Sequence, residues 1–190
     1  MTSRILLQPP PLLGPYAIPQ GAWGNNARTR LTGKAWDAIR RQVAATTGAR
    51  CAVCQHQEID CRTGKTRLPH CHEEWTFTRG TEDNPEHLAQ TLTRLVPLCG
   101  PCHSTQHLRN STRQGRWDIA VEQLARVNGW TTGEATARAE DAVRASVELD
   151  HLVWNLDLSL IGCVRMSEVT AGADPRPQVF NPAPILPASL

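Results

Sequence analysis

The 190-residue chain has few aromatic residues, no long hydrophobic stretch and little net charge. Phenylalanine occurs twice and tyrosine once, so a core has few large side chains and needs other means of stabilisation. No apolar run approaches the roughly 20 residues that span a membrane. The first residues also lack the apolar stretch of a signal peptide. We therefore expect one cytoplasmic domain with no membrane contact.

Seven cysteines stand out against this composition. An odd number, in a chain expected to remain in a reducing compartment, favours metal binding over disulfide formation. Cys61 and Cys163 have no partner at ligand spacing, and we assign them no chemistry. The sequence holds two Cys-x-x-Cys pairs, formed by Cys51, Cys54, Cys99 and Cys102. Two such pairs are typical of a closed tetrahedral zinc site that stabilises a small fold.

Two histidines follow the second cysteine pair. His103 comes directly after it and His107 lies four residues later. On a helix beginning near Pro101, both imidazoles would point the same way and share one cation. Such a site keeps positions open for phosphate and water. We therefore expect a structural zinc and a second, catalytic divalent metal, for which zinc, manganese, nickel and magnesium all remain open.

Periodicity and capping residues predict mixed secondary structure. Thr32 and Thr131 are expected to cap helices, and Gly129 to end one. The expected elements are a helix over 33–47, strands over 68–77 and 88–98 joined by the polar loop 78–86, helices over 117–127 and from 131 to about 151, and a packed strand over 152–161. The fold class is therefore α+β.

The chain divides into three parts by composition. Residues 1–20 carry five prolines and are expected to form an extended arm, and residues 167–190 to form a disordered proline-rich tail. The domain is expected over 21–166, with a finger core at 48–110 and a helical extension at 115–162. Residues 28–116 hold 14 Lys and Arg against 8 Asp and Glu. This local excess is what a phosphate-binding surface requires.

The order of the metal motifs resembles that of the HNH endonucleases, which belong to the ββα-metal (His-Me finger) class. The likeness rests on the first cysteine pair, then His72 in a strand-like segment, then Leu98 with the second pair and His103. The likeness covers roughly residues 18–162. Within the family, the chain resembles a subgroup of bacterial and phage proteins. Further matching segments are Ala22-Trp-Gly-Asn-Asn26, Ala35-Trp36, Cys71-His-Glu-Glu-Trp75, Arg126-Val-Asn-Gly-Trp130 and Trp154-Asn-Leu-Asp-Leu158.

The resemblance implies a zinc-stapled ββα-metal finger with an N-terminal helix and a C-terminal helical extension. It implies that His72 is the general base that activates water. The residue before it is usually a ligand of the catalytic metal, and here that residue is Cys71. A thiolate disfavours magnesium, and a buried strand residue with no metal role remains an alternative for Cys71. His70 shares a strand face with His72 and is the alternative ligand.

The implied activity is metal-dependent hydrolysis of DNA phosphodiester bonds in a bacterial or phage-infected cell. Arg109 and Arg113 follow the metal motif and are candidate phosphate contacts. Arg94 stands where the family has its central Asn, and it is a third candidate. The departures at Arg94 and Cys71 keep an alternative open: a catalytically inactive, zinc-dependent nucleic-acid-binding module. Oligomeric state is left open.

Overall fold

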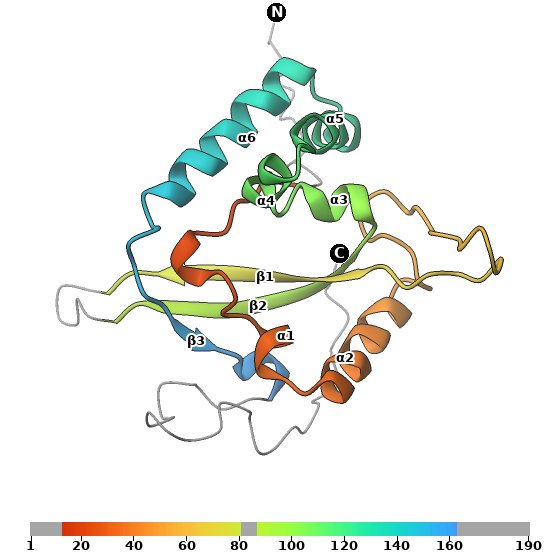
Figure 1. Ribbon diagram of the computed structural model, residues 1–190, viewed down its shortest axis with the longest axis horizontal. Helices are drawn as coiled ribbons and strands as arrows, with labels where there is room; N and C mark the ends of the chain where they lie inside the picture. The colour runs from red at the N-terminus through yellow and green to blue at the C-terminus, as the bar shows by residue number, and fades with distance from the viewer. Residues whose placement is uncertain (1–12, 81–86, 163–190) are drawn as a thin grey trace, which may run out of the picture.

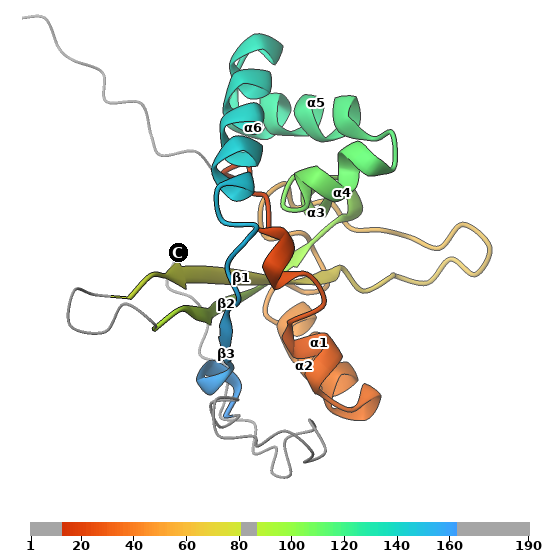
Figure 2. The same cartoon turned by 60° about the vertical axis from the view of Figure 1, so that its left-hand side comes forward.

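The computed structural model describes residues 13–80 and 87–162, and the expected α+β class is confirmed (Figure 1). Helices lie on both sides of one three-stranded sheet, as two views 60° apart show (Figure 2). The elements are η1 (Gln20–Ala22), α1 (Ala27–Arg30), α2 (Gly33–Ala45), β1 (His70–Thr78), β2 (Ala89–Leu98), α3 (Gly100–Ser104), α4 (Leu108–Arg113), α5 (Trp117–Asn128), α6 (Thr132–Val147), β3 (Asn155–Asp157) and η2 (Ser159–Ile161).

The sheet separates small apolar cores. β1 and β2 pair antiparallel along their length, with a bulge between Glu74 and Trp75, and the short β3 joins β2 in parallel. On one side, α1 and α2 pack against the sheet around Ile39 and Leu158. On the other, α4, α5 and α6 pack on one another around Leu124. Aliphatic side chains thus supply the burial that the scarce aromatic residues do not, at roughly 1.5–3 kcal/mol each.

The helix boundaries follow from capping residues. Thr32 accepts a hydrogen bond from the Ala35 N–H and begins α2, as predicted. α5 ends at Gly129, whose φ of 67° is a left-handed conformation that suits glycine. Thr131 and Glu134 then form a reciprocal capping box that begins α6. These three predicted boundaries are confirmed.

The described part of the predicted proline-rich arm, residues 13–20, is packed against the domain. Leu13 and Ala17 are buried, and the Asn128 side chain bonds both the N–H and the C=O of Leu13. Residues 13–20 therefore belong to the fold, because Asn128 on α5 and the turn between α3 and α4 satisfy part of their backbone. The remainder of the arm, the tail from 167, Cys163 and residues 81–86 of the predicted loop lie outside the described residues.

Two further predictions need correction. α6 ends at Val147, and the apolar stretch 152–161 forms only the three-residue β3 followed by η2. The apolar side chains of this stretch belong to a short strand and a turn that pack on the sheet.

None of the helices that the structure describes combines the length and apolar character that crossing a membrane requires.

Candidate metal centres and cleft

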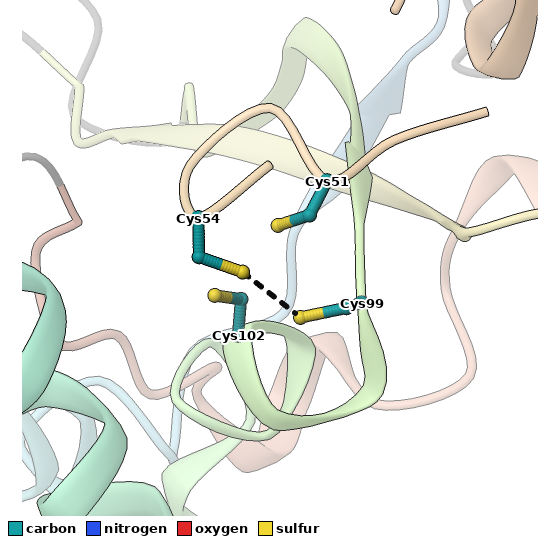
Figure 3. Close-up of side chains that lie close together, drawn as sticks. All are labelled: Cys51, Cys54, Cys99 and Cys102. Atoms are coloured by element: carbon teal, nitrogen blue, oxygen red, sulfur yellow. Dashed lines mark hydrogen bonds between the residues drawn. The ribbon is translucent and has the colours of Figure 1, made fainter. Parts of the chain in front are cut away.

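The paired cysteines meet where β2 ends and α3 begins (Figure 3). The cluster combines Cys99 at the start of α3, Cys102 on that helix, and Cys51 and Cys54 from the loop after α2. Their four sulfur atoms lie within 4.8 Å of one another. A tetrahedral zinc site places thiolate sulfurs roughly 3.8 Å apart, because each Zn–S bond is about 2.3 Å. The four-cysteine cluster can therefore hold a metal ion with little rearrangement.

The four-cysteine cluster is enclosed and braced. The Ala52 N–H donates to the Pro97 carbonyl at 2.8 Å, which ties the first cysteine pair to β2. The Gln123 amide on α5 donates to Cys102 Sγ at 2.9 Å. Cys51 and Cys102 are fully buried. Hydrogen bonds from the neighbouring thiols lower the pKa of Cys51, so the cluster already favours a thiolate there.

A second cluster is formed by His72, His103 and His107. One ring nitrogen from each lies within 4.8 Å of the others, and Nε2 of His103 is 3.1 Å from Nε2 of His107. The ring of His72 meets the other two edge-on, at centroid distances of 5.5 and 5.3 Å. This three-histidine cluster can also hold a metal ion, since three imidazoles are a common zinc donor set.

The prediction that His103 and His107 share one helix is wrong, although their rings do converge. α3 ends at Ser104, and His107 is the residue before α4. The N-terminal segment takes the hydrogen bonds that a continuing helix would make. The Tyr16 N–H donates to the Thr105 carbonyl, and the Tyr16 carbonyl accepts from the next helix at 3.2 Å. A turn therefore brings the ring of His107, which precedes α4, to the ring of His103 on α3.

His72 is more deeply buried than a residue that handles solvent water needs to be. It is 2% exposed, and neither of its ring nitrogens has a hydrogen-bond partner. Burial lowers the pKa of His72 to about 3, and that of His107 to about 4. A buried nitrogen without a hydrogen-bond partner destabilises a fold. An imidazole that stays neutral keeps a nitrogen lone pair available, which is what a metal ligand needs. The predicted role of general base stays a prediction.

Neither of the two neighbours considered as ligands, Cys71 and His70, belongs to the three-histidine cluster. Cys71 points to the other side of β1, where it packs against the core beside α2. Burial and the charge of Glu73 raise the pKa of Cys71 to about 12. The tentative ligand role of Cys71 is therefore corrected to that of a packed strand residue. His70 is exposed, and its ring stacks on His103 at 4.6 Å between centroids.

A cleft of about 800 Å³ opens beside the three-histidine cluster. Its walls come from the segment 18–28, from α2, from the start of β1 and from α3 and α4. His70, His103 and His107 line it. The cationic side chains on its walls are Arg28, Arg40, Arg109 and Arg113, against the carboxylates of Asp37 and Glu73.

Two of these arginines are neutralised by carboxylates. Arg40 pairs with Asp37 at 2.6 Å, and Arg109 forms two hydrogen bonds to Asp150 at 2.5 and 2.9 Å. Among residues 13–80 and 87–162, Arg28 and Arg113 form no ion pair. Arg113 lies 5.3 Å from the ring centre of Trp23, which holds it at the cleft wall. Of the two predicted phosphate contacts on α4, Arg113 is thus available and Arg109 is engaged.

Arg94, the third predicted phosphate contact, lies outside the cleft. Its guanidinium forms a two-bonded pair with Glu74 on β1, with both distances 2.8 Å. The two residues are directly opposite in the antiparallel register. Arg94 therefore links two strands, and its neutralised charge is a poor phosphate ligand.

Two residues that support the site were given no role by the sequence: Glu73, which lies in a matching segment, and Gln90, which was not singled out. The Glu73 carboxylate accepts the N–H groups of Ala27 and Arg28, which fixes α1 beside β1. Its pKa is raised to about 7 by burial, against the lowering effect of those two bonds. Gln90 is buried and donates to the Asn25 carbonyl at 2.8 Å. Both contacts join residues 45 to 65 positions apart in the chain, so no local pattern around Gln90 signals its role.

Comparison of the chain with family models, with curated proteins and with solved structures gives no match. The likeness to the HNH endonucleases thus rests on the motifs alone. The observed molecule has a ββα unit, made of β1, β2 and α3, with a four-cysteine cluster and a three-histidine cluster at its end.

Proposed function

We propose that the protein is an HNH-like, metal-dependent endonuclease that hydrolyses DNA phosphodiester bonds. The observation that carries the proposal is the three-histidine cluster at the wall of a cleft that also presents unpaired arginines. A purely structural metal site is closed, as the four-cysteine cluster is, whereas a catalytic site keeps an open position. The four-cysteine cluster fits the first description, and the three-histidine cluster beside the cleft fits the second.

The donor set of the second site favours a transition metal. Three neutral imidazoles suit zinc or nickel best, and they suit magnesium least, because magnesium prefers oxygen ligands. When bound, such a cation would neutralise phosphate charge and lower the pKa of water. His103 and His107 would hold it at the cleft, and the unpartnered His72 is placed to complete the set.

The chain's own residues supply binding and orientation. Arg28 and Arg113 stand at the cleft wall and would bind phosphate oxygens on either side of the scissile bond. Trp23 aligns Arg113, and Glu73 holds the segment that carries Arg28. His70 faces the cleft within reach of His103 and can accept a proton from water there.

A plasmid-nicking assay with magnesium, manganese, nickel and zinc tests the proposal. The parent should nick, and His103→Ala should lower the rate by more than roughly 10²-fold, because even a partner of a metal ligand is worth about 10–100-fold. His151→Ala is the matched control, because it removes an exposed imidazole that belongs to neither cluster. A parent that binds DNA but never cleaves it with any of these metals would favour the inactive binding module.

Raised metal concentration separates the two roles of His72. If His72 is a ligand, excess metal should partly restore cleavage by His72→Ala, as it should for His103→Ala. If His72 is the general base, metal should restore only the His103 variant. Single-turnover rates over a range of metal concentrations distinguish these outcomes.

A further inference from the structure

The chain between the first cysteine pair and β1 forms a protruding hairpin, residues 55–69, which both views show extending away from the body (Figures 1 and 2). Ile59 and Thr66 pair across it as an antiparallel bridge. The Asp60 N–H donates to the Lys65 carbonyl, and the Asp60 carbonyl accepts from the Gly64 N–H, both at 2.8 Å. The 55–69 hairpin is thus a narrow two-stranded ribbon with an ordered tip.

The tip of the 55–69 hairpin carries uncompensated positive charge. All residues from 61 to 68 are exposed. The carboxylates are engaged, since Glu58 accepts the Gly100 N–H at 2.9 Å and Asp60 pairs with Arg67 at 2.7 Å. Arg62 and Lys65 remain, and neither forms an ion pair within the described part of the chain. These two cations at the end of the ribbon are therefore available to an anionic partner.

The hairpin continues one wall of the cleft. Leu68 and Pro69, at its base, line the cleft, and His70 directly follows them. His70 is five residues after Lys65, and extended chain rises about 3.3 Å per residue, so the tip lies within roughly 17 Å of the histidine end of the cleft. Five base pairs of B-form DNA rise about the same distance.

We propose that the 55–69 hairpin enters the major groove of the B-form duplex, within about five base pairs of the scissile phosphate. The proposal rests on the proposed function, because it takes the substrate in the cleft to be DNA. The major groove admits a two-stranded ribbon. Arg62 and Lys65 then contact phosphates and base edges on the groove walls, and the enzyme acts on duplex rather than single-stranded DNA.

Binding measurements on two double variants, each of which lacks two positive charges, test the hairpin proposal. Arg62→Ala with Lys65→Ala is compared with Arg138→Ala plus Arg144→Ala, which removes equal charge from α6, where neither arginine lines the cleft. The probes are a labelled 30-base-pair DNA duplex and an RNA duplex of equal length, over a salt series without added divalent metal. The hairpin variant should bind DNA about tenfold more weakly, and its log–log salt slope should fall by about 1.8, or 0.9 for each lost phosphate contact.

The remaining measurements separate the possible failures. A-form RNA has a narrow major groove, so its affinity should change less than twofold between the parent and the hairpin variant. Cleavage at saturating DNA should stay within twofold of the parent. Unchanged DNA affinity and salt slope would overturn the hairpin proposal while leaving the proposed function intact. Equal losses on DNA and RNA would overturn the groove placement. A parent that binds neither duplex would overturn both proposals.

Discussion

The four-cysteine cluster and the three-histidine cluster share one short stretch of chain, because Cys102 and His103 are neighbours on α3. Cys102 turns inward, is fully buried and receives a hydrogen bond from α5. His103 turns towards β1 and lines a cleft. One helical step therefore separates an enclosed site from an accessible one. Adjacent residues on a helix point about 100° apart, so the five-residue helix α3 can contribute a ligand to each cluster.

The comparison also shows how each cluster depends on distant chain. The four-cysteine cluster is clamped by a loop that bonds to β2 and by Gln123 on α5. The three-histidine cluster depends on Tyr16, whose backbone bonds to Thr105 and Leu108 where the chain turns between His103 and α4. The first cluster should therefore control global stability, and the second should respond to local changes that leave the fold intact.

Removal of one cysteine is expected to have the largest effect. Cys51→Ser should unfold the protein, because a structural zinc site contributes on the order of 10 kcal/mol and three thiolates hold it poorly. Cys61→Ser is the matched control, since Cys61 is exposed and outside both clusters. Thermal melting and metal analysis report the outcome. A Cys51→Ser protein that melts like the control would show that the cluster is not a structural metal site.

A fall in pH should next weaken the fold through the three-histidine cluster. The pKa values of His72 and His107, normally about 6.5, are lowered to about 3 and 4 by burial. The unfolded chain therefore takes up protons below pH 6.5 that the folded chain excludes, so stability present above pH 6.5 is lost as pH falls towards 4.

Urea unfolding between pH 7.5 and 5.5, with the second metal removed, measures this effect. His107→Gln should reduce the slope of unfolding free energy against pH by up to the contribution of one bound proton. The exposed His151→Gln should leave the slope unchanged. Equal slopes in all three proteins would show that the buried histidines do not titrate as the structure requires.

A smaller change should follow from Gln106→Ala. The Gln106 amide donates to the Gly14 carbonyl at 2.8 Å and to Thr105 Oγ1 at 3.0 Å, and so supports the turn before His107. Loss of a hydrogen bond costs about 1 kcal/mol, so affinity of the second site for manganese should fall roughly fivefold to tenfold. Titration calorimetry measures this. The zinc of the four-cysteine cluster should be retained, and its loss would contradict the independence of the two clusters.

Arg94→Ala should have the smallest effect. The pair with Glu74 is partly exposed, and such pairs contribute about 0–1 kcal/mol. DNA affinity and its salt dependence should match the parent, because Arg94 lies outside the cleft. If the slope of log affinity against log salt concentration fell by about 0.9, Arg94 would be a phosphate contact, as predicted from the sequence.

The sequence alone predicted what depends on short-range chemistry. The Thr32 cap, the Thr131 capping box and the cysteine pairing all follow from spacing within a few residues. It failed where distant chain decides the local structure. No pattern near His107 shows that Tyr16 will end α3. Arg94 likewise looked available for phosphate because Glu74, its partner, is 20 residues away.

The central claim, that the four-cysteine cluster maintains the fold and the three-histidine cluster performs the chemistry, is tested most directly by one chelator titration. Cleavage and folding are followed in the same samples as chelator strength rises. The account predicts that cleavage disappears first, with the thermal transition unchanged, and returns when manganese is added. Only stronger chelation, which strips the thiolate site, should unfold the protein. Loss of cleavage and of the thermal transition together, or cleavage that survives complete metal removal, would contradict it.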